Sequence, residues 1–316
     1  MSSEDLLYHV DGDLVPVDEA TVSVRDRGFT YGDGAFETMR AYGGDVFEWE
    51  RHAERLAASC ETLGIDHGLD AADLRARVDE TLAANDLDEA YLKLSITRGP
   101  QPGTLTPQPT TDPTVVVYVA ELPRSGVGGT TPWDDPAVVQ TVKTRKPATD
   151  ALPADAKTHN YLNSILARQE LFDADEALVR GPDGAVAEGA ASNLFFVDER
   201  GLYTPSTDIP LLPGITRAVV LELAADLDVP VYTGRYDVAD VREAEEAFLT
   251  NSTWELRPVE RLDGIEIGGG PVTELLTRAF DRLVEQRHYG GLDDGDGEGR
   301  AENDDGPDAD AGEDAP

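Results

Sequence analysis

The chain is 316 residues long, and its 63 Asp and Glu residues against 26 Lys and Arg residues give a formal net charge of −37 at pH 7. A field of that sign repels phosphate backbones and anionic lipid headgroups, so we expect neither nucleic acid nor a membrane as a partner. We interpret the charge as a solvated acidic surface, as expected of a protein adapted to very high salt, where screening weakens self-repulsion. The length predicts two domains.

Two further features indicate the compartment. Cys60 is the only cysteine, which excludes an internal disulfide and favours a reducing environment. The N-terminal segment lacks a positive region followed by an apolar run, and no segment approaches the roughly 18 apolar residues of a membrane span. We therefore expect a soluble, cytoplasmic protein.

Residues 1–122 predict an α+β domain of short strands and two helices. Turn residues between apolar runs predict two hairpins and two later strands, at Leu6–Val10 with Leu14–Val17, Ala35–Tyr42 with Val46–Trp49, Tyr91–Thr97 and Val115–Glu121. Apolar side chains at helical spacing predict one helix over Glu50–Leu63, with Gly64 as its stop, and a second over Ala71–Asn85.

A stretch rich in Gly, Pro and Ser, residues 123–136, predicts a linker to a second domain over residues 137–289. Its expected helices and strands lie near Tyr161–Phe172, Ala177–Arg180, Val186–Glu188 and Asn193–Val197, from Ile215 onward, and near Val272–Gln286. The elements mix without a βαβ rhythm, which favours an α+β fold over a doubly wound sheet. Residues 290–316 hold eleven acids and one base, Arg300, so we expect an acidic, disordered tail.

Lys157 is one of only four lysines and is a candidate for covalent chemistry. A lysine that attacks a carbonyl must be unprotonated, and so must be desolvated or lie beside another cation. Lys157 stands just before a predicted helix and away from any run of acids. A lysine near a helix start is more often a surface charge, so this residue alone decides nothing.

Three other segments could complete a site around such a lysine. Glu188 is an acid among small residues, where a flat ligand can approach the backbone and a carboxylate can pair with a protonated ring nitrogen. The turn Leu212–Arg217 opens a helix whose free amides suit phosphate, and Arg55 offers a guanidinium fork for the same group. The alternatives are a solvated turn, an ordinary helix start and a surface arginine. The histidines show no ligand spacing, so we expect no metal site.

Together these segments resemble the class IV aminotransferase family. The motifs that carry the resemblance are Asp26–Arg40, His52-x-x-Arg55-Leu56, Lys157-x-x-Asn160, Glu188-Gly189-x-x-Ser192-Asn193-Leu194-Phe195, Leu212-Pro213-Gly214-Ile215-Thr216-Arg217 and Phe248–Val259. The resemblance implies a two-domain fold of type IV, like that of D-amino-acid aminotransferases, and pyridoxal 5'-phosphate as cofactor. It also implies a homodimer with active sites near the subunit interface.

The resemblance assigns expected roles residue by residue. Lys157 is implied to carry the cofactor as a Schiff base and Glu188 to contact the pyridine nitrogen. The phosphate is implied to be held by Arg55, the amides of Ile215 and Thr216, and the hydroxyl of Ser252. Asn193 and Tyr161 complete the candidate cofactor contacts, and the candidates for substrate contacts are Tyr31, Arg40 and Arg98. Stem packing or an ion pair is the alternative for each arginine.

Within the family, the chain is most similar to the 4-amino-4-deoxychorismate lyases of folate synthesis, which release 4-aminobenzoate and pyruvate. The spacing from Lys157 to Asn160 and the segment Asn251-Ser252-Thr253 depart from branched-chain aminotransferases, whereas that spacing, Thr250-Asn251-Ser252 and Ser192-Asn193-Leu194-Phe195 are most similar to the lyases. D-amino-acid aminotransferases tend to place a histidine close to an arginine that binds the substrate carboxylate, whereas no histidine closely follows Arg98 in this chain. Both kinds of aminotransferase stay open as alternatives, because pocket loops decide substrate. A non-catalytic binding protein of the same fold is a further alternative.

Overall fold

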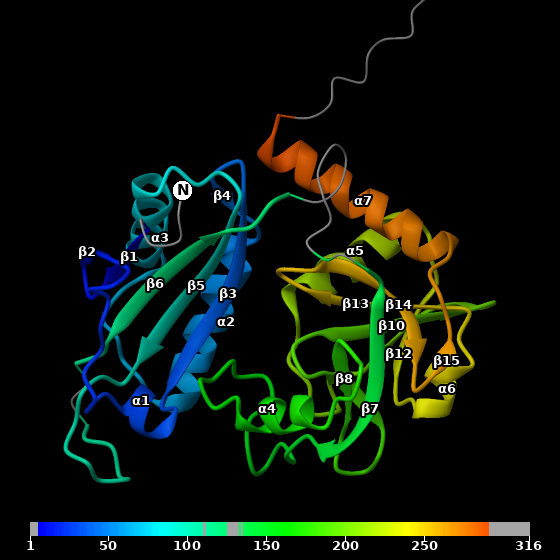
Figure 1. The fold of residues 1–316 in the computed structure, drawn as a ribbon, viewed down its shortest axis with the longest axis horizontal. Coiled ribbons are helices and arrows are strands. Elements are labelled where there is room, and N and C mark those ends of the chain that lie inside the picture. The colour runs from blue at the N-terminus through cyan, green and yellow to red at the C-terminus, as the bar shows by residue number, and fades with distance from the viewer. Residues whose placement is uncertain (1–5, 110–111, 125–132, 134, 291–316) are drawn as a thin grey trace, which may run out of the picture.

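The computed structural model describes residues 6–109, 112–124, 133 and 135–290. Two β-sheets, each built from its own stretch of chain, carry helices on their faces (Figure 1). The predicted α+β class is therefore confirmed. Within the described residues, no helix is both long and apolar enough to cross a membrane.

The first sheet is antiparallel and six-stranded, in the order β2-β1-β6-β5-β3-β4. Its strands are β1 (Leu7–Val10), β2 (Asp13–Pro16), β3 (Gly34–Tyr42), β4 (Asp45–Val46), β5 (Ala90–Thr97) and β6 (Val115–Glu121). The helices α2 (Trp49–Leu63) and α3 (Ala71–Ala84) cover one face, because their apolar side chains share one core with alternate strand residues. The other face is left for the site.

The first predicted hairpin is confirmed, whereas the second is confirmed only in part. Strand β4 covers just Asp45 and Val46, and Trp49, predicted as the end of a strand, begins α2 instead. Glu48 before it has φ 55°, a left-handed conformation that ends an extended run. Gly64, predicted to stop the helix, is its left-handed C-cap with φ 63°.

The second sheet is mixed and nine-stranded, in the order β12-β11-β10-β13-β14-β7-β8-β9, with β15 paired to β14. Its strands are β7 (Ala137–Arg145), β8 (Glu176–Arg180), β9 (Val186–Gly189), β10 (Asn193–Asp198), β11 (Gly201–Pro205), β12 (Val231–Gly234), β13 (Glu246–Asn251), β14 (Glu255–Leu262) and β15 (Ile265–Glu266). The remaining helices are α1 (Arg27–Tyr31), α4 (Leu162–Gln169), α5 (Ile215–Asp226), α6 (Val238–Arg242) and α7 (Pro271–His288).

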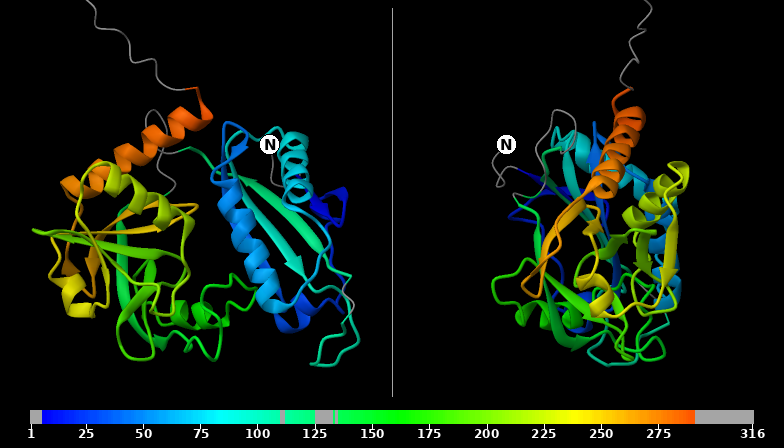
Figure 2. Two further views of the ribbon diagram at one scale, coloured as in Figure 1. Left: turned by 180° about the vertical axis from the view of Figure 1, so that it is seen from behind. Right: turned by 90° about the vertical axis from the view of Figure 1, so that its right-hand side faces the viewer.

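An aromatic cluster joins the two sheets. Tyr42 and Phe47, from the end of the first sheet, share a core with Phe280 of α7 and with the stacked pair Phe195 and Phe248, whose ring centroids lie 5.0 Å apart. Figure 2 shows α7 running from the second sheet toward the β4 end of the first. Burial of these rings fixes the relative position of the sheets at one end.

The segment around Lys157 joins the sheets at the other end. The amide of Phe36 donates to the carbonyl of Lys157 at 3.0 Å, and the amide of His159 donates to the carbonyl of Gly34 at 2.8 Å. Strand β4 pairs only with Ala41 and the residue after it, so the start of β3 is an open edge. The Lys157 segment occupies that edge, which places its side chain between the sheets.

The second half of the chain contains the expected strands β8 to β10 and helices α4, α5 and α7, with shifted ends. The strands β7 and β11 to β15 and the helices α1 and α6 were not predicted. The proposed division at residues 122 and 137 stays a prediction. Neither sheet takes a strand from the linker, which favours the division. Tyr42 and α7, however, share one core although they lie on opposite sides of the linker. The predicted tail lies almost wholly outside the described residues.

Candidate active site

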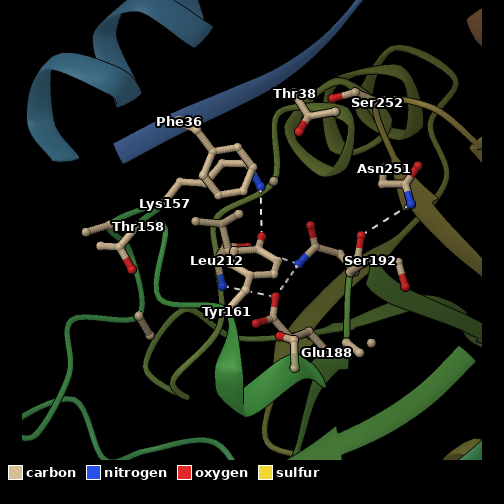
Figure 3. A pocket seen from close by; sticks show the side chains of 18 of the residues that line it. Phe36, Thr38, Lys157, Thr158, Tyr161, Glu188, Ser192, Leu212, Asn251 and Ser252 are labelled. Atoms are coloured by element: carbon tan, nitrogen blue, oxygen red, sulfur yellow. Dashed lines mark hydrogen bonds between the residues drawn. The ribbon is translucent and has the colours of Figure 1, made fainter. Parts of the chain in front are cut away.

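A cavity of about 260 Å³ lies between the open face of the first sheet and the second sheet. Its walls come from β3, the Lys157 segment, the β9–β10 turn, the start of α5 and the end of β13 (Figure 3). All eight residues predicted to hold the cofactor line it, although they are scattered over the sequence: Arg55, Lys157, Tyr161, Glu188, Asn193, Ile215, Thr216 and Ser252. Their individual roles stay predictions.

The amine of Lys157 lies inside the cavity against aromatic side chains. Its Nζ is 3.0 Å from the hydroxyl of Tyr161 and 4.5 Å from the centroid of the Phe36 ring (Figure 3). Burial lowers the pKa of Lys157 to about 8, aided by the nearby Arg55 and opposed by Glu37. A lower pKa means that more of the amine is neutral near neutral pH, as attack on a carbonyl requires.

Glu188 is held on the opposite side by three donors. Its Oε2 accepts hydrogen bonds from the amide of Leu212 at 3.0 Å and from the Asn193 side chain at 3.3 Å (Figure 3). Its Oε1 pairs with Nζ of Lys146 at 2.5 Å. The carboxylate is thereby fixed in orientation at the cavity wall, where it can accept from one further donor.

The start of α5 presents free backbone amides beside a guanidinium group, an arrangement that suits an anion. Gly214 is the N-cap and gives no side-chain hydrogen bond, so the first amides of the helix have no intrahelical or capping acceptor. Arg55 lies beside them, because its Nη1 donates to the carbonyl of Pro213 at 3.0 Å. Thr250, also at the cavity, is buried with no hydrogen-bond partner for its hydroxyl among the described residues.

The three predicted substrate contacts do not line the cavity of this chain. Arg40 is buried at the far end of β3, donates to the carbonyl of Thr253 and pairs with Glu255. Arg98 is also buried and forms an ion pair with Asp33. Tyr31 is 40% exposed on the surface of α1. The arrangement of the two arginines is therefore that of structural ion pairs, the alternative stated above.

The cavity also contains polar residues that sequence reasoning missed. Thr38 and Tyr91 face it from the first sheet, and Lys146 faces it from the end of β7. Alternation along β3 could have identified Thr38, because it lies two residues after Phe36 on the same face. Lys146 could have been found from the scarcity of lysines alone. The described residues contain no group of acids, histidines or cysteine able to hold a metal ion.

This set of groups fits pyridoxal phosphate. A partly neutral amine, a fixed carboxylate and a cationic pole with free amides match an aldehyde, a ring nitrogen and a phosphate, respectively. The unpartnered buried hydroxyl of Thr250 indicates a further polar contact that the described part of the protein does not itself supply. The fold and the site thus define an enzyme of the lysine-dependent, pyridoxal-phosphate class.

The chain belongs to the class IV aminotransferase family. A model of that family, described as amino-transferase class IV, matches residues 34–262. Members of the family use pyridoxal phosphate and are enzymes, which confirms the expected cofactor and the enzymatic nature of the chain. The alternative of a non-catalytic binding protein is accordingly set aside.

Three similar relatives carry three different activities in their names. A Methanocaldococcus jannaschii protein, provisionally named a branched-chain-amino-acid aminotransferase, is 35% identical over 286 residues, which are 90% of this chain and 97% of that protein. The aminodeoxychorismate lyase of Bacillus subtilis is 30% identical over 88% of this chain and 95% of the lyase. The D-alanine aminotransferase of Staphylococcus haemolyticus is 29% identical over 88% of this chain and 98% of its own length.

Solved structures confirm the fold of type IV. The branched-chain aminotransferase of Thermoproteus uzoniensis, solved with norvaline, matches with a TM-score of 0.82 at 29% identity, over 91% of this chain and 98% of the other. A second branched-chain amino acid aminotransferase, solved with pyridoxamine 5'-phosphate, matches with a TM-score of 0.83, at the same identity and coverage.

Proposed function

We propose that the chain is a 4-amino-4-deoxychorismate lyase that holds pyridoxal phosphate on Lys157 and releases 4-aminobenzoate and pyruvate. The cofactor supplies an electron sink for the carbon that bears the substrate's amino group. Lys157 would hold the aldehyde of the cofactor, and its freed amine would take the proton from that carbon. The bond between the neighbouring ring carbon and the enolpyruvyl oxygen would then break and the ring would become aromatic. The leaving group would depart as enolpyruvate, which takes up a proton on its methylene carbon to become pyruvate.

The other residues of the cavity would orient the amine of Lys157 and hold the cofactor. The hydroxyl of Tyr161, 3.0 Å from Nζ of Lys157, would keep the amine directed at the reacting carbon. Glu188 would hold the proton on the ring nitrogen. The phosphate would lie between Arg55, the first amides of α5 and the hydroxyl of Ser252.

The observation that carries the choice of a lyase is that three of the four lysines lie in or against the cavity, although the chain has a net charge of −37. Of its four lysines, Lys146 and Lys157 line the cavity, and Lys93 pairs in register with Thr38 and lies 4.3 Å from the Phe36 ring centroid. Aminodeoxychorismate carries two carboxylates, and Lys93 would attract them, because Lys157 would hold the cofactor and Lys146 pairs with Glu188.

An aminotransferase acting on branched-chain or D-amino acids is the second candidate. It is favoured by the names of the Methanocaldococcus and Staphylococcus relatives, whereas the Bacillus relative favours the lyase. At about 30% identity these names do not choose between the activities, because substrate depends on a few loop side chains.

One assay separates the two candidates. The enzyme is given aminodeoxychorismate without any 2-oxo acid, and separately leucine or D-alanine with 2-oxoglutarate, in concentrated potassium chloride. Release of 4-aminobenzoate and pyruvate in the first reaction supports the lyase. Glutamate formation in the second, without release in the first, would replace it by an aminotransferase. Lys157→Ala should abolish either reaction, and Lys143→Ala, an exposed lysine on β7, should abolish neither.

We also propose that the protein acts as a homodimer in the cytoplasm of a cell with high internal salt. Apolar side chains of α4 next to the cavity support the dimer, since Leu162, Ile165 and Leu166 are each about half exposed, at 59%, 50% and 46%. Phe29 of α1 is exposed as well, at 71%. Light scattering that gives the mass of a single chain would contradict the dimer.

A further inference from the structure

Glu37 is a fully buried carboxylate directly behind the cavity wall. Phe36 and Thr38, its neighbours on β3, line the cavity. Because successive strand residues point to opposite faces, Glu37 points away from the cavity toward α2. Its exposed fraction is 0%, so its charge must be matched by partners inside the protein.

Those partners are two residues of α2. Arg55 grips the carboxylate at both oxygens, with Nε 2.8 Å from Oε1 and Nη2 2.6 Å from Oε2. Nδ1 of His52 lies 2.7 Å from Oε2. Burial by itself would raise the pKa of the Glu37 carboxyl, but the hydrogen bonds from Arg55 and His52 lower it to about 2.

The two hydrogen bonds to Glu37 determine where the guanidinium of Arg55 can point. An arginine has five N–H groups in a rigid plane, and contacts to Glu37 and to the carbonyl of Pro213 use three of them. The remaining two are on Nη1 and Nη2. Pro213 immediately precedes Gly214, the N-cap of α5, so the plane of the guanidinium is fixed next to the free amides of that helix.

We propose that Glu37 is a positioning residue for the cofactor's phosphate: it fixes Arg55 beside α5 and so makes the site select the phosphorylated cofactor over its dephosphorylated form. The inference rests on the proposed placement of the phosphate at Arg55. A long, free arginine loses rotamer entropy when it binds a ligand, whereas Arg55 has lost that entropy on folding. The opposing effect is charge, because Glu37 neutralises part of the attraction between Arg55 and a phosphate.

The test compares pyridoxal phosphate with pyridoxal, which lacks only the phosphate. Each is titrated into the full-length protein freed of cofactor, and Kd is measured from the absorbance of the bound form. Glu37→Gln keeps the size of the side chain and removes its charge. We expect Kd for pyridoxal phosphate to rise about tenfold to a hundredfold, as for the loss of charge-assisted hydrogen bonds, and Kd for pyridoxal to change by less than about twofold.

The matched control is Glu54→Gln, which removes an exposed carboxylate from the same helix, next to Arg55 in sequence. It should leave both Kd values unchanged. Arg55→Lys provides a double-mutant cycle: a lysine keeps the charge but cannot be gripped at two points, so adding Glu37→Gln to it should cost little further affinity. If Glu37→Gln does not fold, Glu37→Asp, which withdraws the carboxylate by one methylene, should show the same selective loss.

Two results would overturn the proposal. Tighter binding of pyridoxal phosphate by Glu37→Gln would mean that Glu37 competes with the phosphate, and an equal loss for both forms would mean a purely structural role. A wild-type protein that binds neither form would overturn the cofactor's placement as well. A wild type that selects pyridoxal phosphate but lacks lyase activity would contradict only the proposed reaction.

Discussion

The amine of Lys157 should react at a lower pH than an ordinary lysine. Burial lowers its pKa to about 8, so its neutral form becomes dominant above that value. The rate at which the cofactor-free protein captures pyridoxal phosphate should therefore rise between about pH 7 and 9 and then level off. Stopped-flow absorbance measures this rate. A rate that keeps rising to about pH 10 would indicate an unperturbed amine.

The carboxyl of Glu37 should contribute to stability in a defined pH range. Its pKa is lowered from 4.5 to about 2 in the folded protein, so the unfolded chain takes up the proton first as the pH falls. The stabilisation is complete above about pH 5 and is lost progressively toward about pH 2. The difference in Tm between the wild type and Glu37→Gln should shrink over this range. A difference that stays constant down to about pH 3 would contradict the assigned pKa.

Residues of the site could be predicted from the sequence only where they belong to a local motif. Lys157, Glu188 and Arg55 stand in short segments whose residue types indicate a chemical role, and the fold brings them to one cavity. Arg40 lies on the same face of β3 as Phe36, yet it is too far along the strand and is covered by Glu255. That burial depends on a contact between residues 215 positions apart, which no local pattern contains.

At the scale of elements, the entry into α5 should tolerate no side chain at Gly214. A Cβ there would lie 1.9 Å from Oδ1 of Asn193, whose amide group holds Glu188. Gly214→Ala should therefore lower stability by about 1–3 kcal/mol, as overpacking does, and weaken cofactor binding. Thermal unfolding and absorbance titration measure the two effects. Gly103→Ala, with no atom within 4 Å of the added Cβ, is the control, and an equal effect of both would contradict the explanation.

The sequence predicted the elements that are stabilised by contacts within their own segment. It did not predict those that depend on distant segments. Helix α2 and the β1–β2 hairpin were predicted because spacing, caps and turns lie within the segment itself. Strand β7 was missed, since both of its neighbours, β8 and β14, pair with it in parallel and come from later in the chain. Trp49 was assigned to a strand because it ends the apolar run that follows the turn Gly43-Gly44-Asp45. Its ring is buried equally well from a helix.

At the scale of the whole molecule, stability should depend strongly on salt. With a net charge of −37, self-repulsion opposes the compact state, and about 1 M salt shortens the screening length to about 3 Å. Tm should rise as potassium chloride is raised from about 0.1 to 2 M. A chain ending at Gly290 should show most of the same rise, because removing the tail's −10 still leaves −27. A Tm that is independent of salt would contradict this.

The placement of the lysines makes chemical labelling unusually informative for this protein. Lys93, Lys146 and Lys157 lie in or against the cavity, and Lys143 alone of the four is exposed. After treatment with an amine-acylating reagent, peptide mass spectrometry would therefore measure how far each cavity lysine has reacted, with Lys143 as an internal standard. Ligands that enter the cavity would appear as protected peptides, so unassigned substrates could be screened without knowing which reaction they undergo.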